Sequence, residues 1–461
     1  MRKPTFTNFN TQLGYQEAEL VVPQKPKYNY RSSTLLLVAF ATCFYARLLS
    51  TYGVPQVINF VHFVVVPLAS LVAILQTRTK QRSQIEISHA FLIGLVALFA
   101  INLASALLNK AGFINVVLEF LLLCEPFLIL LAITCLPLTP KYILRFRKWI
   151  TIFALSNLVL ALFQRYVLNI QNSRDIAGWD LIQGVFYFSG SGHVVSSSVS
   201  LCFAVYYFAS FKTQALWIRA LVVLGAIWQV IESDTKQVFL VAFIAIISMV
   251  LLKLNNIIKL IQYVTIFIVG AAALYWAANN IYDNTELVYW VSNIDLVKDG
   301  LELKFSVFSF IISYYHSSLN WIIGLGPGHT IGRLGGWMIR DYYSLLQPLG
   351  VTQSQIGETL WRIVGNNPLG DKSSMWSPFF GWAGIWGDLG IAGLLAYIYI
   401  WVLSWKYFCV DDISKFIALT IFINGAIFTQ MEEPGYMLFV CILIGLRWQE
   451  HRALIPKKAK I

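Results

Sequence analysis

Apolar stretches long enough to cross a lipid bilayer alternate with shorter polar ones along most of the chain. A hydrocarbon core of about 30 Å requires about 20 helical residues at about 1.5 Å each. Measured against this length, twelve segments are predicted to span the membrane. They are approximately residues 34–50, 55–75, 87–108, 114–137, 149–169, 194–211, 215–231, 236–252, 257–278, 381–408, 414–430 and 434–449. The pattern therefore predicts an all-α, polytopic membrane protein.

One polar stretch, residues 279–380, is much longer than the others and separates the ninth predicted span from the tenth. Within it, the apolar and aromatic residues 304–323 predict a helix on the membrane surface, and residues 353–364 carry apolar side chains at helical spacing. Only this stretch is long and polar enough to build a site outside the bilayer, so we expect the functional residues there. The chain then divides into a tail (1–33), nine spans (34–278), the long loop (279–380), three spans (381–449) and a second tail (450–461).

Composition excludes an ordinary soluble domain, because 57% of the residues are hydrophobic and only 12% are charged. The net charge of +11 does not indicate nucleic acid, since Lys and Arg collect on the cytoplasmic side of membrane proteins. About two thirds of the 34 Lys and Arg residues fall on one side of the predicted topology. This bias places both termini in the cytoplasm and residues 279–380 outside. The six cysteines lie in or beside apolar spans, so neither a disulfide framework nor a metal site is expected.

Short glycine motifs accompany this layout. The long loop contains Gly324-Leu325-Gly326-Pro327-Gly328-His329, and the helix that follows contains Gly390-Ile391-Ala392-Gly393. A weaker motif is Gly184-Val185-Phe186, followed by Gly190-Ser191-Gly192-His193. With twelve spans and a large loop after the ninth, these motifs make the chain resemble the O-antigen ligase and polymerase-like family of membrane glycosyltransferases, which have a GT-C-like helical fold.

The chain departs from this family pattern in two places. Ser233-Asp234-Thr235-Lys236 stands where the family commonly has a Ser-Arg pair, which keeps a cation but not a guanidinium. Ser377-Pro378-Phe379-Phe380 stands where many members have a His-Asn or His-Ser pair. Because a ligase would use that histidine, the resemblance favours a polymerase over a ligase.

The resemblance implies that a glycan moves from a polyprenyl-diphosphate donor to a sugar hydroxyl at the outer face of the plasma membrane, without a metal or other cofactor. The leaving diphosphate needs fixed cations, and the attacking hydroxyl needs a proton acceptor. The implied partners are a polyprenyl-diphosphate-linked oligosaccharide, an acceptor glycan and membrane lipids. Flippase and chain-length regulator proteins are further possible partners, and no nucleic acid is expected.

Candidate residues for these two tasks come from the external segments. His329, Arg333 and Arg340 are spaced so that a helix over residues 331–346 would bring them to one face, although Gly335-Gly336 weakens the helix prediction. His329 or His193 would accept the proton. The predicted diphosphate ligands are Arg174, Lys236, Arg333 and Arg340, with Arg362 and Arg165 as further candidates. Each cation also has a simpler explanation, which is a lipid headgroup or a nearby carboxylate such as Asp234, Glu232, Asp341, Glu358 or Asp371.

Charged residues inside or beside the predicted spans are costly and call for partners. Arg47 and Glu119 fall at similar depths and are predicted to pair. Glu125 is assigned either to helix packing or to proton relay, and Glu432 and Glu433 are predicted to pair with loop arginines rather than to act as bases. The alternative functions are a transporter or flippase, which would usually show paired repeats with broken helices, and a membrane scaffold that binds a partner enzyme.

Overall fold

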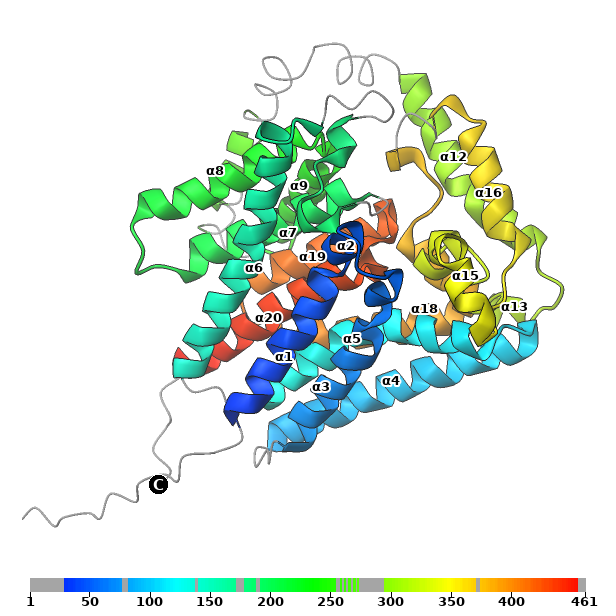
Figure 1. The fold of residues 1–461 in the computed structure, drawn as a ribbon, viewed down its shortest axis with the longest axis horizontal. Coiled ribbons are helices and arrows are strands. Elements are labelled where there is room, and N and C mark those ends of the chain that lie inside the picture. Colours follow the sequence, from blue (N-terminus) through cyan, green and yellow to red (C-terminus); the bar gives the residue numbers. More distant parts are fainter. Residues whose placement is uncertain are drawn as a thin grey trace, which may run out of the picture.

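The computed structural model describes residues 29–76, 82–136, 140–170, 178–187, 191–253, 294–369 and 374–454, together with a few positions between 258 and 272. Within these residues the chain forms helices and turns and no β-strand (Figure 1). The predicted all-α fold is therefore confirmed. The ninth predicted span, 257–278, and the first part of the long loop lie largely outside the described residues.

The described helices match the apolar stretches closely. They are α1 (Asn29–Phe44), α2 (Ala46–Thr51), α3 (His62–Gln76), α4 (Arg82–Asn109), α5 (Phe113–Cys135), α6 (Pro140–Tyr166), α7 (Gly192–Ser210), α8 (Leu216–Glu232), α9 (Lys236–Leu251), α12 (Ile294–Ser313), α13 (Asn320–Ile323), α14 (Ile339–Asp341), α15 (Tyr343–Leu346), α16 (Gln355–Gly365), α18 (Gly381–Tyr407), α19 (Asp412–Ile427) and α20 (Pro434–Leu454). Helices thus occur at the other eleven predicted spans, and the few described positions of the ninth, between 258 and 272, are helical as well.

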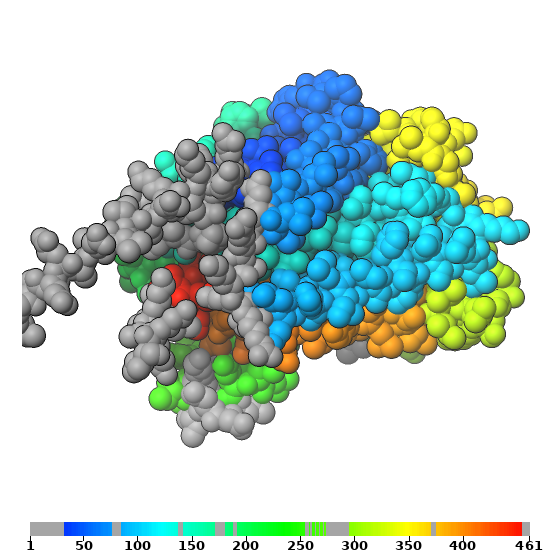
Figure 2. Space-filling model, turned by 90° about the horizontal axis from the view of Figure 1, so that it is seen from below, coloured from blue at the N-terminus to red at the C-terminus, as the bar shows by residue number. Residues whose placement is uncertain are grey.

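Within the described residues, six helical segments are long and apolar enough to cross a membrane. They are Gln56–Leu75, Gln84–Asn109, Phe113–Cys135, Tyr142–Tyr166, Gly192–Ser210 and Gly381–Tyr407. Helix α4 lies along the face seen in Figure 2, with α18 beside it. It carries an outward stripe of exposed apolar residues, Leu92, Val96, Phe99, Leu103 and Leu107. A stripe of this kind suits lipid and is unfavourable in water, which indicates a membrane protein.

Helix α20 passes through the core of the bundle. Its residues from Tyr436 to Ile444 are all fully buried, and α1, α5, α7 and α19 pack around it. Phe439 meets the rings of Phe40 and Phe44 of α1, with ring centroids 6.2 Å and 6.1 Å apart. A helix that is apolar on all sides is typical of the core of a large protein or of a membrane span, and α20 lies in the core.

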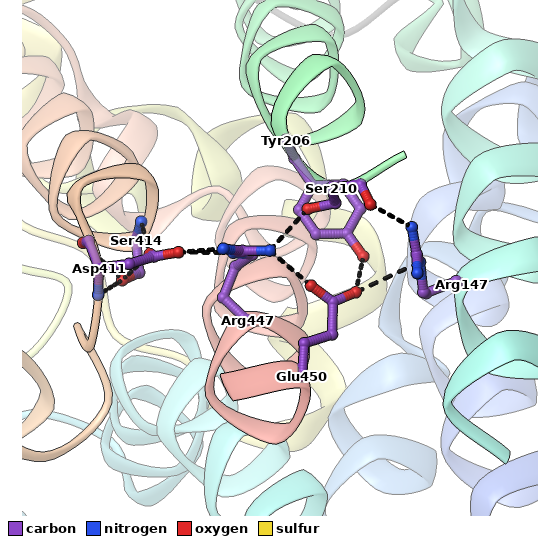
Figure 3. A network of polar contacts seen from close by, with 7 residues as sticks. All are labelled: Arg147, Tyr206, Ser210, Asp411, Ser414, Arg447 and Glu450. Atoms are coloured by element: carbon purple, nitrogen blue, oxygen red, sulfur yellow. Dashed lines mark hydrogen bonds and ion pairs between the residues drawn. The ribbon is translucent and has the colours of Figure 1, made fainter. Parts of the chain in front are cut away.

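At one end of the bundle, a polar network ties α6, α7, α19 and α20 together (Figure 3). Arg447 of α20 donates to Asp411, to Glu450 at 2.7 Å and to the Ser210 hydroxyl at 2.9 Å. Arg147 of α6 lies 3.2 Å from the other carboxylate oxygen of Glu450. Each of these charged side chains thus has a partner of opposite sign, and the helix ends here are those predicted to be cytoplasmic.

Residues 294–380 add a helical unit beside the ends of α4, α5 and α18 (Figure 1). Helix α16 confirms the predicted amphipathic helix, with Ile356, Leu360 and Val364 buried, whereas Ile363 is 40% exposed. These buried residues pack in one apolar cluster with Ile311 of α12 and with α18. The unit therefore rests on the membrane helices through an apolar interface of its own.

A buried lysine fastens this unit to the bundle. Lys304 of α12 donates to the carbonyl oxygens of Met375, Ser377 and Ile427 at 3.0, 3.2 and 2.9 Å. Its ammonium also lies 5.0 Å from the centre of the Phe380 ring. Three carbonyl acceptors match the three N–H donors of an ammonium group, so one side chain joins α12, the segment before α18 and the end of α19.

The predicted continuous helix over residues 331–346 is wrong. A π-helical turn covers Leu334–Met338, α14 follows with three residues, and Tyr342 interrupts the helix before α15. Gly335 lies so close to Gly328 that an added Cβ would stand 2.5 Å from its carbonyl oxygen. Tertiary packing against the preceding turn therefore determines the local conformation and overrides helical periodicity.

Candidate functional site

A small hollow lies where α1, α2, α3, α5, the 333–342 segment and the start of α20 meet. Its cavity volume is about 30 Å³, within about 380 Å³ of empty space that includes the open mouth. Its polar lining residues are Arg47, Asn59, His62, Arg333, Tyr342 and Glu433. Phe60, Phe63, Leu122 and Met338 are among the apolar residues that complete it. The hollow thus combines two guanidinium groups, an imidazole, a phenol and a carboxylate with several apolar side chains.

Arg333 is held in this hollow by the start of α20. Its guanidinium forms an ion pair with Glu433, and its carbon Cζ lies 4.2 Å from the centre of the Trp337 ring. The backbone N–H of Arg333 donates to the carboxylate of Glu432. Glu433 therefore confirms the predicted pairing with a loop arginine, while Glu432 binds the backbone of the same residue.

Arg47 supplies the second guanidinium. It donates to the Tyr342 hydroxyl, and its Cζ lies 5.6 Å from the Trp337 ring centre and 5.5 Å from that of Tyr342. Among the described residues Arg47 has no carboxylate partner. The predicted pairing of Arg47 with Glu119 is wrong, because neither carboxylate oxygen of Glu119 has a hydrogen-bond partner within the described part of the chain.

A histidine and a glutamate from two helices form a buried pair beside the hollow. Nδ1 of His62 lies 2.9 Å from Oε2 of Glu125, and both side chains are more than nine-tenths buried. A carboxylate accepts hydrogen bonds, so Nδ1 of His62 is the donor in this contact, and Nε2 has no partner among the described residues. Glu125, which the sequence assigned to packing or proton relay, thus orients a histidine that lines the hollow.

The 324–330 turn, which leads to Arg333, is anchored on a break in α18. Gly390 has φ 66° and ψ −167°, values open essentially only to glycine, and its neighbour across the contact, Gly324, has φ 75° and ψ −165°. The N–H groups of Leu325 and Gly326 donate to the carbonyls of Gly387 and Asp388 at 2.8 and 3.1 Å. The glycine motifs 324–329 and 390–393 therefore meet at one contact, where the two backbones touch.

The Asp388 side chain completes this anchor. Its carboxylate accepts from the N–H and hydroxyl of Thr330, both at 2.7 Å, and from the N–H of Gly328 at 3.1 Å. Its backbone carbonyl accepts from Ser105 of α4 at 2.8 Å. Arg333 lies only three residues beyond Thr330, so this anchor sets the position from which it enters the hollow.

Buried carboxylates gather behind Arg333. An added Cβ on Gly332 would stand 3.1 Å from Glu432 and 3.4 Å from Asp388, so both acids flank the same backbone position. Burial raises the pKa of Glu432 to about 8, the charge of Asp388 acts in the same direction, and the hydrogen bond from the Arg333 N–H opposes it. Glu432 therefore holds a proton through neutral pH, unlike an ordinary surface glutamate.

His329, a predicted proton acceptor, does not line the hollow. Its Nδ1 is 3.1 Å from the Leu325 carbonyl and its Nε2 is 2.8 Å from the Thr352 hydroxyl, which itself accepts from the N–H of Gly112. Burial lowers the pKa of His329. Both ring nitrogens are thus engaged in holding the turn to the start of α5, and the predicted common face with Arg333 and Arg340 is not formed.

Arg340 and Arg362 lie away from the hollow. Arg340 forms an exposed ion pair with Asp341 at 3.0 Å and lies over the Trp361 ring, with its Cζ 4.3 Å from the ring centre. Arg362 contacts the Thr359 hydroxyl at 3.5 Å on α16, rather than the predicted carboxylate of Glu358. Of the three loop arginines predicted to bind diphosphate, the structure brings only Arg333 to the hollow.

The remaining predicted residues lie near the ends of α6 to α9. Arg165 forms an ion pair with Glu232, and Lys236 pairs with Asp234 at 3.1 Å. His193, at the start of α7, is 3.4 Å from Asp180. None of these side chains lines the described hollow. Arg174 lies outside the described residues.

Sequence reasoning overlooked three of the hollow's polar residues, Asn59, His62 and Tyr342, and gave Arg47 a structural role. His62 stands inside an apolar stretch with no polar neighbour, so no motif marks it. One signal was available, since a histidine and a glutamate within predicted spans both need a partner. The described residues include no group of three or more His, Cys, Asp or Glu side chains placed to hold a metal ion.

The fold and the hollow together define a helical membrane protein with a cationic, partly apolar site at the ends of its helices. No model of a protein family matches the chain, and a search of curated proteins finds no match either.

Proposed function

We propose that the chain is a metal-independent membrane glycosyltransferase that polymerises polyprenyl-diphosphate-linked oligosaccharides at the outer face of the plasma membrane. In this proposal twelve spans hold both termini in the cytoplasm and residues 279–380 outside. The hollow then lies at the outer helix ends and the Arg447 network at the inner ones. Ligation of a finished glycan to another acceptor uses the same chemistry and is the closest variant of this function.

The observation that carries the proposal is the charge arrangement around Arg47. Its guanidinium faces a hollow with a hydroxyl and two aromatic rings as partners, and the described residues offer it no carboxylate. A second guanidinium, that of Arg333, lines the same space. Arg333 is paired with Glu433 and Arg47 has no carboxylate among the described residues, so the hollow holds one guanidinium more than its carboxylate balances. Two guanidinium groups suit a diphosphate, because a planar fork can bind two phosphate oxygens.

The proposed reaction needs little else from the protein. Arg47 and Arg333 hold the diphosphate and stabilise the charge that it gains as its bond to the anomeric carbon breaks. The rings of Trp337 and Tyr342, which already contact the guanidinium groups, keep them fixed in this position. The apolar lining from α3 and α5 limits water, which strengthens these charge interactions. Arg174 and Lys236 remain candidate ligands for a second lipid.

Purified protein incubated with a polyprenyl-diphosphate-linked oligosaccharide tests this proposal. We expect growth of the glycan and release of polyprenyl diphosphate, and a loss of about 10²-fold or more in Arg47→Met. The matched control is Arg219→Met, because Arg219 donates to the carbonyl of Phe208 away from the hollow. An unchanged donor with the unaltered protein, or full activity in Arg47→Met, would refute the proposal.

The break in α18 is the one observation that favours a different function. Transporters often place substrate sites at discontinuous helices, and Gly390 interrupts an otherwise long apolar helix. A flippase for a lipid-linked glycan would move its substrate between leaflets without cleaving it. Reconstitution into liposomes with a labelled lipid-linked oligosaccharide distinguishes the two, since movement of intact lipid supports transport and release of prenyl diphosphate supports the enzyme.

A further inference from the structure

We infer that His62 is the group that removes the proton from the acceptor hydroxyl, and that Glu125 is its positioning residue. The inference rests on the function proposed above and names residues for a task that the sequence assigned to His329 or His193. It depends on three observations: the contact between His62 and Glu125, the place of His62 in the hollow, and the engagement of His329 elsewhere.

The contact between the two side chains prepares His62 for this role. Nδ1 of His62 is 2.9 Å from Oε2 of Glu125, which fixes the ring and leaves the lone pair of Nε2 on the opposite edge. The ring also lies against Phe63, with centroids 4.1 Å apart, so its rotation is restricted. A carboxylate behind an imidazole stabilises the imidazolium that forms when Nε2 takes up a proton.

Charged groups of both signs lie around His62. Arg47, Arg333 and Glu433 line the same hollow, and Glu125 contacts the ring. A diphosphate held by the two guanidinium groups brings negative charge into the hollow, which stabilises the imidazolium that forms during the reaction.

His329 provides a comparison within the same molecule. Both of its ring nitrogens have partners, the Leu325 carbonyl and the Thr352 hydroxyl. His62 has a partner for Nδ1 alone among the described residues. A histidine that serves only packing would be expected to have hydrogen-bond partners for both ring nitrogens in this way. In His62, Nε2 is left available to a ligand in the hollow.

The step conserves atoms and charge. The acceptor oxygen forms a bond to the anomeric carbon of the donor glycan, and the bond from that carbon to the diphosphate oxygen breaks. The bonding electron pair leaves with the polyprenyl diphosphate, which Arg47 and Arg333 hold. The hydroxyl proton moves to Nε2 of His62, and the imidazolium later releases it to water.

The central experiment compares His62→Asn with His89→Asn. The asparagine amide can still donate toward Glu125 but has no group in place of Nε2, and His89 is an exposed histidine on α4. Glycan extension is measured with membranes that contain the lipid-linked donor, and binding of undecaprenyl diphosphate is measured with purified protein. We expect His62→Asn to lose about 10² to 10⁴-fold in rate while its affinity for undecaprenyl diphosphate changes less than about threefold. His89→Asn should behave like the unaltered protein.

Two further variants separate proton transfer from a structural effect. Glu125→Gln keeps an acceptor for Nδ1 and removes the charge, so we expect kcat to fall by about tenfold or more with the donor KM unchanged. His62→Ala opens space beside the hollow, and added imidazole should restore part of its activity. A loss of packing alone would not respond to imidazole.

The outcomes separate the inference from the proposed function. If His62→Asn extends glycan within about threefold of the unaltered rate while Arg47→Met does not, the base is another group and this inference is wrong. Failure of imidazole to rescue His62→Ala, where that variant still binds undecaprenyl diphosphate, also refutes it. If the unaltered protein itself neither extends glycan nor releases prenyl diphosphate, the proposed function is refuted first.

Discussion

Replacing Arg333 by methionine tests whether the ion pair with Glu433 serves stability or function. Both side chains are more than nine-tenths buried, at 7% and 6% exposed, so the change leaves a carboxylate without its partner in a poorly solvated position. Breaking a buried pair from one side typically costs about 3–5 kcal/mol. We expect Arg333→Met to be destabilised by this amount, because Met fills most of the space but carries no charge.

The double variant Arg333→Met with Glu433→Gln removes the stranded charge. Replacing both members of a buried pair by neutral groups is often close to neutral for stability. We therefore expect the double variant to recover at least half of the lost free energy of unfolding. It should not recover activity, since the diphosphate has lost one of its two guanidinium ligands, and a loss of about 10²-fold or more should remain.

Stability is measured by unfolding in mixed detergent micelles, and activity by release of polyprenyl diphosphate from a lipid-linked oligosaccharide. The contrast between the two readouts is the test. A double variant that regains the original rate would show that Arg333 is a structural residue only. A double variant as unstable as Arg333→Met would show that the loss comes from packing around Trp337 and not from the unpaired carboxylate.

Three further variants test the fold around the hollow. Burial raises the pKa of Glu432 to about 8, so unfolding releases a proton and stability falls as pH rises from about 4.5 to about 8. Glu432→Gln should therefore flatten the pH dependence of stability. Equal slopes for the variant and the unaltered protein in thermal unfolding at several pH values would contradict this. Gly390→Ala should cost about 3 kcal/mol or more, because the new Cβ would stand 2.4 Å from the Ile322 backbone, whereas Gly365→Ala has open space and should be neutral in the same unfolding assay. Arg447→Met should destabilise the protein by about 2–4 kcal/mol through its lost ion pairs without changing the donor KM; an altered KM would link that network to the site.

The sequence predicted the helices well because long apolar runs leave the backbone little choice in lipid. Helices α4 and α18 lie almost where the runs begin and end. The amphipathic helix α16 was equally predictable, since Ile356 and Leu360 repeat at helical spacing over a short segment. In each case one local period decides both the secondary structure and the buried face.

The region around Arg333 could be predicted only in part. The pairing with Glu433 followed from charge alone, but the conformation of residues 331–346 did not follow from periodicity. It depends on two tertiary contacts. Gly335 packs against Gly328, and the Trp361 indole N–H donates to the carbonyl of Gly336. The predicted partner of Arg47 was also wrong. That prediction relied on two charged residues lying at a similar depth in the membrane, and depth along a helix says nothing about the direction in which a side chain points.

The Arg447 network and the hollow differ in a way that supports a functional role for the hollow. In the Arg447 network each described charge meets a partner of opposite sign, and Arg447 itself has two carboxylates, Asp411 and Glu450. In the hollow, Arg47 meets a neutral hydroxyl and two rings and has no carboxylate among the described residues. A partly buried guanidinium in apolar surroundings is unfavourable without an anion, so a purely structural site would be expected to supply one. The unmatched charge supports the proposal that this hollow binds an anion, and Arg333 and His62 line the same space in which the proposed donor and acceptor would meet.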